Sequence, residues 1–300
     1  MPKPSPTANP SAGVLGLGLI GSRVAARLLA AGFPLALWNR TPREFPELPP
    51  RLARRADVAR QADILQIFVA DDAALDETVR ALLPALTPRH VVISHATVSP
   101  LTVRSLESEV RARGAAFLDA PFTGSRDAAA SGQLAYYVSG EPAALERARP
   151  LLQASAKAII PAGAVGRAST IKIATNVMAA AAAVSLAEAV NLLRAHGIDP
   201  AVLLEALQHN AARSGVTDLK LPCMLEQDFA SRFSARNMRK DLRLARGLAD
   251  EGQGSLTAAM LRLYEAACAD GLGDEDFATV VKVRGGLKPE QGERREDRRG

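Results

Sequence analysis

A glycine-rich turn near the N-terminus restricts the fold more than any other feature. Gly16, Gly18 and Gly21 form the pattern G-x-G-x-x-G between an apolar run beginning at Val14 and an amphipathic stretch that follows. This order predicts a strand, a tight turn and a helix. In a dinucleotide site the first glycine makes the turn, the second lets a pyrophosphate approach the backbone, and the third lets helix and strand pack closely. The phosphates would meet the free N–H groups of the helix N-terminus. Taken alone, the pattern fits an ordinary glycine-rich turn equally well.

The residues after the second expected strand indicate which dinucleotide binds. The apolar segment 35–38 ends in Asn39, Arg40 and Thr41. An NAD site usually carries Asp or Glu here, which accepts hydrogen bonds from the ribose hydroxyls. No carboxylate is present, and the planar guanidinium of Arg40 can pair with a 2′-phosphate and stack on adenine. The sequence therefore predicts NADP(H), with a solvated loop arginine as the alternative interpretation of Arg40.

Strands and helices then alternate along the chain. Apolar strands are expected at 62–69 and 91–94, each followed by a helix. This alternation predicts a mostly parallel, doubly wound sheet with helices on both faces. Ligands of such sheets bind beyond the carboxyl ends of the strands, so we expect Val69, Ala70 and Thr97 to face the cofactor.

A strand, turn and second strand are expected between Phe117 and Gly140. The turn contains Thr123, Gly124 and Ser125, whose hydroxyls and backbone amides could hold an anion. The segment fits a plain loop equally well.

An alanine-rich run from Arg167 to His196 predicts a helix of about eight turns. It is too apolar to be solvated all round, and it contains too many charged residues to be a membrane span. Lys172 and Asn176 are four residues apart and share one face of this helix. A lysine at this position could also extend its ammonium group to the surface.

The remaining elements are expected to be helices, at 200–210, 219–227, 237–249 and 256–270. Four segments are expected: a disordered arm at 1–12, an NADP-binding Rossmann domain at 13–165, an all-helical substrate and oligomerisation domain at 166–285, and a disordered charged tail at 286–300.

Composition excludes several other functions. The formal net charge is +5, but basic and acidic residues are interspersed, which favours anionic small molecules over nucleic acid. Cys223 and Cys268 lie far apart and form no redox motif, and the four histidines have no metal-ligand spacing, so we expect free thiols and no metal. The N-terminus lacks the apolar run of a signal peptide. We therefore expect a cytoplasmic protein with no membrane partner.

Five motif blocks in a fixed order give the chain a resemblance to a known family. The blocks are Gly16–Gly21 with Asn39-Arg40-Thr41; Thr97–Pro100; Asp119-Ala120-Pro121 through Gly124 and Gly132; Gly166 with Lys172 and Asn176; and Phe233 with Lys240-Asp241-Leu242. From Gly13 to about Val283 the chain resembles the β-hydroxyacid dehydrogenase family, which contains 3-hydroxyisobutyrate dehydrogenase. It is most similar to the branch of glyoxylate and succinic semialdehyde reductases.

The resemblance implies a role for individual positions. Lys172 matches the family's catalytic lysine, and Asn176 matches the asparagine that helps to hold the substrate. Together with the glycine motif, it implies that the cofactor-binding residues are Gly16, Gly18, Leu19, Ile20, Gly21, Asn39, Arg40, Thr41, Val69, Ala70, Thr97 and Lys240. The substrate-binding residues that it implies are Thr123, Gly124, Ser125, Phe233, Arg236 and Asp241. Similar proteins form dimers or tetramers, so a homodimer or homotetramer is expected.

Three departures from the family pattern affect the substrate more than the reaction. Ser125 replaces a common glycine, Ala96 replaces a serine beside Thr97, and Val69-Ala70 replaces Leu-Pro. The expected activity is an NADPH-dependent interconversion of a short aldehyde acid, of the glyoxylate or succinic semialdehyde type, and its hydroxy acid, with a lysine as general acid. The alternatives are a 3-hydroxyisobutyrate or tartronate semialdehyde type of dehydrogenase, an imine reductase, and a non-catalytic NADP(H)-binding interaction protein.

Overall fold

The computed structural model describes residues 10–41, 44–48, 53–249 and 255–283. The chain divides into two compact units, Met1–Thr175 and Asn176–Gly300, and the division falls inside one long helix. The expected charged tail at 286–300 lies outside the described residues, as does the expected arm at 1–12 apart from its last three residues.

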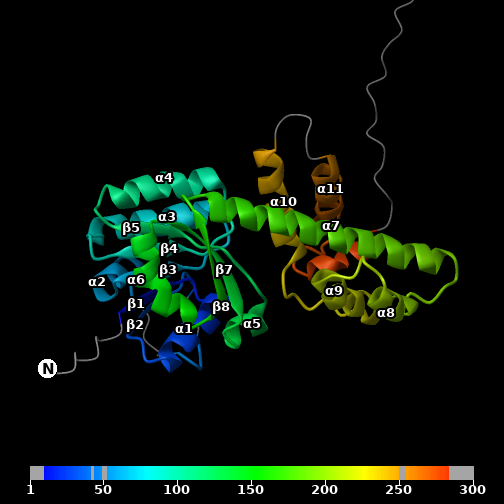
Figure 1. Ribbon diagram of the computed structural model, residues 1–300, viewed down its shortest axis with the longest axis horizontal. Coiled ribbons are helices and arrows are strands. Elements are labelled where there is room, and N and C mark those ends of the chain that lie inside the picture. Colours follow the sequence, from blue (N-terminus) through cyan, green and yellow to red (C-terminus); the bar gives the residue numbers. More distant parts are fainter. Residues whose placement is uncertain (1–9, 42–43, 49–52, 250–254, 284–300) are drawn as a thin grey trace, which may run out of the picture. The chain divides into compact units, whose positions relative to one another are not determined.

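The first unit is built on one mixed sheet (Figure 1). Five parallel strands lie in the order β2 (Leu35–Trp38), β1 (Ala12–Leu15), β3 (Ile64–Ile67), β4 (Val91–Ser94) and β5 (Ala116–Asp119). The sheet continues with β7 (Leu134–Gly140), which is antiparallel to β5 and to the short β6 (Phe122–Thr123). The last strand, β8 (Ala156–Gly163), pairs with β7 in parallel. The expected mostly parallel sheet is confirmed.

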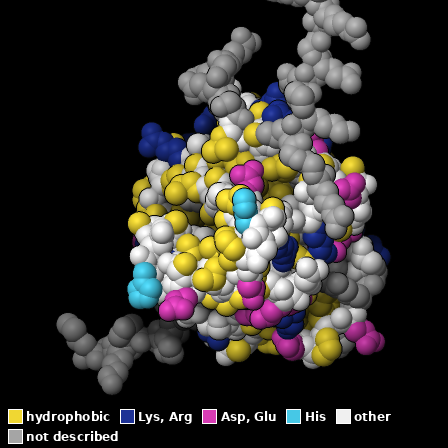
Figure 2. Space-filling view, turned by 90° about the vertical axis from the view of Figure 1, so that its right-hand side faces the viewer, with side chains coloured by type: hydrophobic (Ala, Val, Ile, Leu, Met, Phe, Trp, Pro, Cys, Tyr) yellow, Lys and Arg dark blue, Asp and Glu magenta, His cyan; other side chains and the backbone are white. Residues whose placement is uncertain are grey.

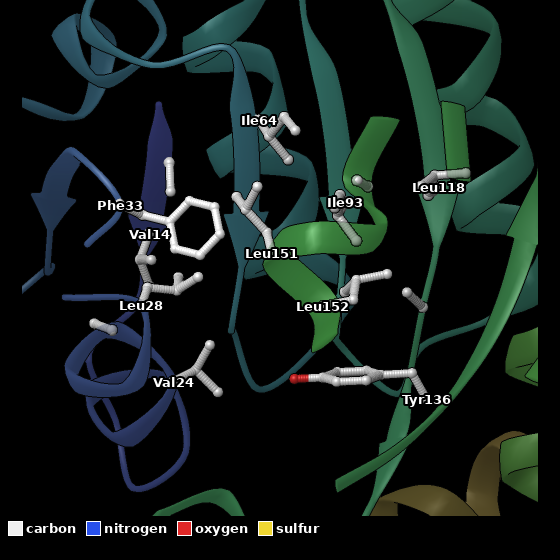
Figure 3. Close-up of a cluster of buried hydrophobic side chains, with 14 of the residues drawn as sticks. Val14, Val24, Leu28, Phe33, Ile64, Ile93, Leu118, Tyr136, Leu151 and Leu152 are labelled. Carbon is white, nitrogen blue, oxygen red and sulfur yellow. The ribbon is translucent and has the colours of Figure 1, made fainter. Parts of the chain in front are cut away.

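Helices cover both faces of this sheet. They are α1 (Gly21–Ala30), α2 (Val58–Gln61), α3 (Asp72–Leu82), α4 (Pro100–Arg111), α5 (Arg126–Ala130) and α6 (Pro142–Gln153), with short 3₁₀ turns η1 (Arg55–Asp57) and η2 (Leu83–Ala85). Successive strand residues point to opposite faces. Thus Val14 packs into a core with α1 and α6 (Figure 3), whereas its neighbour Leu15 packs into a second core with α2, α3 and α4. The sheet is therefore doubly wound.

A single long helix, α7 (Arg167–Ala195), connects the units and has 29 residues. Among the described residues it is the one helix long and apolar enough to cross a membrane by length and composition, and 44% of that apolar window is buried. Ala180, Ala183 and Val190 of this helix are fully buried in the core of the second unit. A long core helix meets the same length and composition criteria.

The second unit is helical throughout its described part, as expected. After α7 come α8 (Val202–Ala206), η3 (Leu207–His209), α9 (Gly215–Glu226), α10 (Ala235–Leu248), α11 (Ser255–Ala269) and η4 (Phe277–Lys282). The helix expected at 200–210 is a single α-helical turn followed by a 3₁₀ turn. Helix α9 begins earlier than expected because Ser214 and Thr217 form a reciprocal capping box at its start.

Candidate active site

The glycine loop between β1 and α1 contains two glycines that the packing of the chain requires and one, Gly18, that borders open space. Gly16 has φ +96°, and a Cβ there would lie 2.0 Å from the carbonyl oxygen of Phe68. A Cβ on Gly21 would lie 2.0 Å from the carbonyl oxygen of Gly16. A Cβ on Gly18, in contrast, would meet nothing within 4 Å. Two glycines are therefore needed for packing, and the space at Gly18 fits the close approach of a pyrophosphate.

Asn39 fastens this loop from the end of β2. Its Oδ1 accepts a hydrogen bond from the backbone N–H of Leu17 at 2.9 Å, and its Nδ2 donates to the carbonyl oxygen of Thr41 at 2.7 Å. Arg40 and Thr41 are exposed beside the loop. Asn39 thus has structural partners, whereas the exposed side chains of Arg40 and Thr41 can meet a ligand from solvent.

The remaining expected loop residues follow the same edge. Leu19 is 60% exposed and Ile20 is the residue before α1. Ala70 is exposed after β3, whereas Val69 and Thr97 are half-buried after β3 and β4. These positions lie at the carboxyl ends of adjacent parallel strands, where ligands of doubly wound sheets bind.

Asp72 links two of these strand ends, a role that sequence analysis missed. Asp71 is the N-cap of α3, and its side chain accepts the backbone N–H of Ala74. Asp72 Oδ1 instead accepts the N–H of Ser99 at 2.9 Å and the hydroxyl of Thr102 at 2.6 Å. The loop after β3 is therefore bound to the start of α4.

His95 is a second residue whose role was missed. Its ring is buried, with Nδ1 2.8 Å from the carbonyl oxygen of Ala120 and Nε2 3.0 Å from the side-chain amide of Gln66. The ring of Phe68 stacks on it at 4.3 Å between centroids. Burial lowers the pKa of His95 to about 4, against the opposing hydrogen bond to Ala120. The neutral ring thus connects residues on or directly after β3, β4 and β5.

The neutral ring also defines the orientation of Gln66. Because Nδ1–H donates to Ala120, Nε2 must accept. If the side-chain amide of Gln66 is oriented so that its NH₂ group faces Nε2, this group donates the hydrogen bond that Nε2 accepts. The same orientation engages an amide nitrogen that is otherwise buried without a hydrogen-bond partner among the described residues.

The predicted anion-binding turn follows β6. Thr123 and Gly124 are exposed, and Gly124 has φ +134°, a conformation that favours glycine. Ser125 caps α5, because its hydroxyl accepts the N–H of Ala128 at 3.3 Å. The serine that replaces a glycine of the family pattern therefore has a local structural function.

Lys172 lies on α7 within the first unit, five residues after the helix begins, and its side chain is half-buried. The carboxyl group of Asp119, at the end of β5, binds the backbone of the same helix start. The predicted acid is therefore carried by a helix that is anchored to the sheet that also bears the glycine loop.

Three predicted site residues come together in the second unit. The amide of Asn176 donates to Asp241 Oδ2 at 2.5 Å, and Lys240 Nζ lies 2.8 Å from Asp241 Oδ1. Asp241 is buried at 2% exposure, so this pairing compensates a charge removed from water.

The other predicted residues of the second unit have different partners. Phe233 packs edge-on against Phe277, with ring centroids 5.9 Å apart. Arg236 forms an exposed ion pair with Asp274 at 3.0 Å. Across the described part of the chain, no group of three or more His, Cys, Asp or Glu side chains could hold a metal ion.

Comparison with known protein families gives two matches that together span nearly the whole chain. Residues 11–166 match the NAD-binding domain of 6-phosphogluconate dehydrogenase. Residues 166–284 match the family described as NAD-binding of NADP-dependent 3-hydroxyisobutyrate dehydrogenase. The first match contains the glycine loop, and the second begins one residue before α7.

Individual relatives cover the chain to a similar extent. The chain is 30% identical over 282 residues to glyoxylate/succinic semialdehyde reductase 2 of Arabidopsis thaliana, covering 91% of this chain and 79% of that protein. It is 30% identical over 297 residues to the NAD-dependent L-serine dehydrogenase of Pseudomonas aeruginosa, covering 93% and 98%. Among solved structures, Mycobacterium tuberculosis 3-hydroxyisobutyrate dehydrogenase with L-serine superposes with a TM-score of 0.83 at 25% identity, covering 92% and 100%.

Proposed function

The chain belongs to the β-hydroxyacid dehydrogenase family and is an NAD(P)-dependent oxidoreductase, and on this premise we propose that it reduces a short aldehyde acid to its hydroxy acid with NADPH. Aldehyde acids of the glyoxylate or succinic semialdehyde type are the proposed substrates. The observation that carries the proposal is Lys172, the match to the family's catalytic lysine, on a helix of the same unit as the glycine loop.

The preference for NADPH is supported by the chemistry at the end of β2. Residues 38–41 contain no carboxylate, Asn39 is engaged by the glycine loop, and Arg40 is exposed. A guanidinium binds phosphate through paired, charge-assisted hydrogen bonds, whereas it has no acceptor for ribose hydroxyls. The 2′-phosphate of NADPH is therefore the group that Arg40 fits.

Replacing Arg40 with Glu tests this preference. We expect the ratio of kcat/KM with NADPH to that with NADH to fall by roughly ten- to hundredfold, because a phosphate contact is replaced by repulsion. Arg113→Glu is the matched control, since Arg113 is exposed just before β5, at the amino end of the strand and away from the cofactor edge. An unchanged ratio in Arg40→Glu contradicts the assignment.

Lys172 is proposed to act as a general acid. Bound nicotinamide supplies the hydride for a carbonyl carbon, and negative charge then develops on the carbonyl oxygen. An ammonium group within hydrogen-bond reach stabilises this charge and delivers the proton. A lysine side chain ordinarily carries its proton at neutral pH, so it can act as the acid in the reductive direction. In the oxidative direction the lysine must first lose its proton, so we expect alkaline conditions to favour oxidation.

The turn after β6 is proposed to hold the substrate carboxylate. Thr123 and Gly124 are exposed and offer a hydroxyl and a backbone amide, while the Ser125 hydroxyl already caps α5. In the second unit, Asn176 and Asp241 match substrate-pocket residues of the family, and Lys240 matches a cofactor contact. We propose the same roles here.

An NADPH-consumption screen tests the proposed activity. The panel contains glyoxylate, succinic semialdehyde, tartronate semialdehyde, methylmalonate semialdehyde and a cyclic imine, each with NADPH and with NADH. The reverse direction is assayed with L-serine and 3-hydroxyisobutyrate. We expect the highest kcat/KM for glyoxylate or succinic semialdehyde with NADPH.

Other outcomes of the screen identify the competing functions. A preference for L-serine or 3-hydroxyisobutyrate with NAD⁺ would favour the activities named for two of the relatives. Turnover of the imine alone would indicate an imine reductase, an assignment that the retained Lys172 argues against. Cofactor binding without any turnover would indicate a non-catalytic protein.

A homodimer or homotetramer is proposed from the surface of the helical unit. Large apolar side chains at the end of α7 and in the segment after it are about half exposed or more; they are Leu192, Ile198, Val202 and Leu204. Figure 2, which faces this end of the unit, shows hydrophobic side chains gathered among scattered charges. A hollow of about 1010 Å³ also lies along α7, lined in part by Glu188, Leu192 and Val281. Exposed apolar side chains gathered on one face are typical of protein interfaces. Sedimentation analysis tests the assembly.

The cellular site is proposed to be the cytoplasm. Cys223 and Cys268 are both free thiols, as is usual in a reducing compartment. Fractionation of cells expressing the tagged protein tests this location.

A further inference from the structure

The carboxyl group of Asp119 lies fully buried at the end of β5 and binds the first turn of α7. Its Oδ2 accepts hydrogen bonds from the backbone N–H groups of Gly166 at 3.2 Å and Ser169 at 3.0 Å. The same oxygen accepts the Ser139 hydroxyl at 3.1 Å, and Oδ1 accepts the Ser169 hydroxyl at 2.8 Å. Four donors nearly fill the acceptor capacity of a carboxylate, so the group is held from several sides.

This cluster accounts for every N–H group that the start of α7 leaves without a helical partner. A helix has four such groups, which must be satisfied when they are buried. Asp119 accepts the first of these N–H groups, from Gly166, and the fourth, from Ser169. The Ser139 hydroxyl accepts the N–H of Ala168 at 3.3 Å. The carbonyl oxygen of Ala164 accepts the N–H of Arg167 at 3.2 Å. An anion is also favoured here by the positive end of the helix dipole.

The burial of Asp119 makes its contacts with the start of α7, here called the Asp119 anchor, resistant to displacement. Desolvation raises the pKa of Asp119, and the hydrogen bonds from Ser169, Ser139 and Gly166 oppose the rise. Displacing the first turn of α7 would leave a buried carboxylate without donors, which is strongly unfavourable. The helix start therefore cannot move away from β5 without a large loss of stability.

The anchor connects the two parts of the first unit that carry its proposed chemistry. Beyond Asp119 the chain passes through Ala120 and Pro121 into β6, which bears Thr123 of the proposed carboxylate-binding turn. Lys172 follows Ser169 by three residues, so it lies on the helix face that Ser169 presents to Asp119. We propose that Asp119 is a positioning residue for Lys172, an inference that rests on the proposed function. It fixes the position of the lysine relative to β5, the strand after which the chain enters the proposed carboxylate-binding turn.

A double-mutant cycle tests this role. If Asp119 acts through Lys172, the variant Asp119→Ala lowers kcat roughly hundredfold, the size expected for a misplaced catalytic group. In the Lys172→Ala background, the same Asp119→Ala change then lowers the residual kcat by less than about twofold, because no positioned lysine remains to be displaced. The dissociation constant of NADPH stays unchanged in all variants, since the glycine loop is untouched.

Two further variants keep the test decisive. Asp119→Asn can retain the backbone bonds through its oxygen and donate its NH₂ group to the Ser169 hydroxyl, so it should fold. It replaces Asp119→Ala in the cycle if the alanine variant does not fold, with an expected loss in kcat of about tenfold. Tyr136→Phe is the stability control: it removes the buried 2.8 Å contact with the Ser155 hydroxyl, in which no residue of α7 takes part, and it should leave kcat unchanged.

The possible failures are distinguishable. Equal fold losses in the wild-type and Lys172→Ala backgrounds would overturn the positioning role while leaving the proposed function intact. An increase in the NADPH dissociation constant that parallels the loss in kcat would do the same, because it would indicate general damage to the unit. A wild-type protein without turnover on any substrate in the panel would overturn the proposed function and this role together.

Discussion

Asn39 Oδ1 accepts the backbone N–H of Leu17 at 2.9 Å, so the residue directly after β2 holds the glycine loop of the dinucleotide site. The same side chain donates to the carbonyl oxygen of Thr41, which fixes the segment that carries Arg40. One amide therefore shapes both the glycine loop and the segment of the proposed 2′-phosphate site.

Replacing Asn39 with Ala should weaken the binding of both cofactors, and that of NADPH more, because the amide also fixes the segment that carries Arg40. Loss of the bond to Leu17 costs about 1 kcal/mol, which corresponds to roughly a fivefold higher dissociation constant for each cofactor. Asn39→Asp is the informative partner, because it keeps an acceptor for Leu17 but adds a charge that repels a 2′-phosphate. It should weaken NADPH more than NADH. Fluorescence titration measures all four constants, and unchanged constants in Asn39→Ala would refute the role of this amide.

His95 should make the protein sensitive to mild acid. The unfolded chain takes up a proton on this ring near the ordinary pKa of 6.5, whereas burial holds the folded value at about 4. The free energy of unfolding should therefore fall as the pH is lowered from 6.5 to 4, by about 3 kcal/mol from this residue, and the contribution should level off below pH 4. Urea titrations of His95→Met across this range should show a shallower slope. The exposed His209, replaced by Gln, is the control, and an unaltered slope in His95→Met would contradict the prediction.

Lys220 and Asp276 form an ion pair in the core of the second unit. Their side chains are 7% and 1% exposed, Nζ lies 2.8 Å from Oδ1, and the Lys220 ammonium lies 4.3 Å from the centroid of the Phe277 ring. Lys220→Met leaves Asp276 buried without its cation and should lower the free energy of unfolding by about 3–5 kcal/mol. The exposed pair of Arg243 and Glu265 is the control, where Arg243→Gln should cost less than about 1 kcal/mol. Similar melting temperatures for the two variants would show that the buried pair does not stabilise this unit.

The doubly wound sheet and the helical second unit could be predicted from the sequence because their signals are local. The apolar runs at β3 and β4 and the glycines of the loop each lie within a few consecutive residues.

The strand β8 was missed because all its residues are half-buried or exposed and they include Lys157 and Pro161, which hide the alternation of a strand. Pairing with β7, and not its own pattern, makes this segment a strand.

The supporting residues of the site could not be predicted because their partners are distant in sequence. His95 meets Gln66 and Ala120, 29 and 25 residues away, and Asp119 meets Ser169 across 50 residues. No short pattern encodes such contacts. Ser125 is different: it occupies the cap position of α5, which a serine before a short alanine-rich run indicates once that helix is known.

The most direct test is the effect of Lys172→Met on turnover and on cofactor binding, measured in the same preparation. Methionine preserves most of the length and packing of the side chain but removes the ammonium group. We expect kcat on the preferred aldehyde acid to fall by about 10²- to 10⁴-fold, the usual contribution of a general acid, while the NADPH dissociation constant stays within about twofold of the wild-type value. The exposed Lys157→Met on β8 should change neither quantity. If Lys172→Met instead retains wild-type kcat, the lysine is not the acid and the proposed reductase mechanism is wrong.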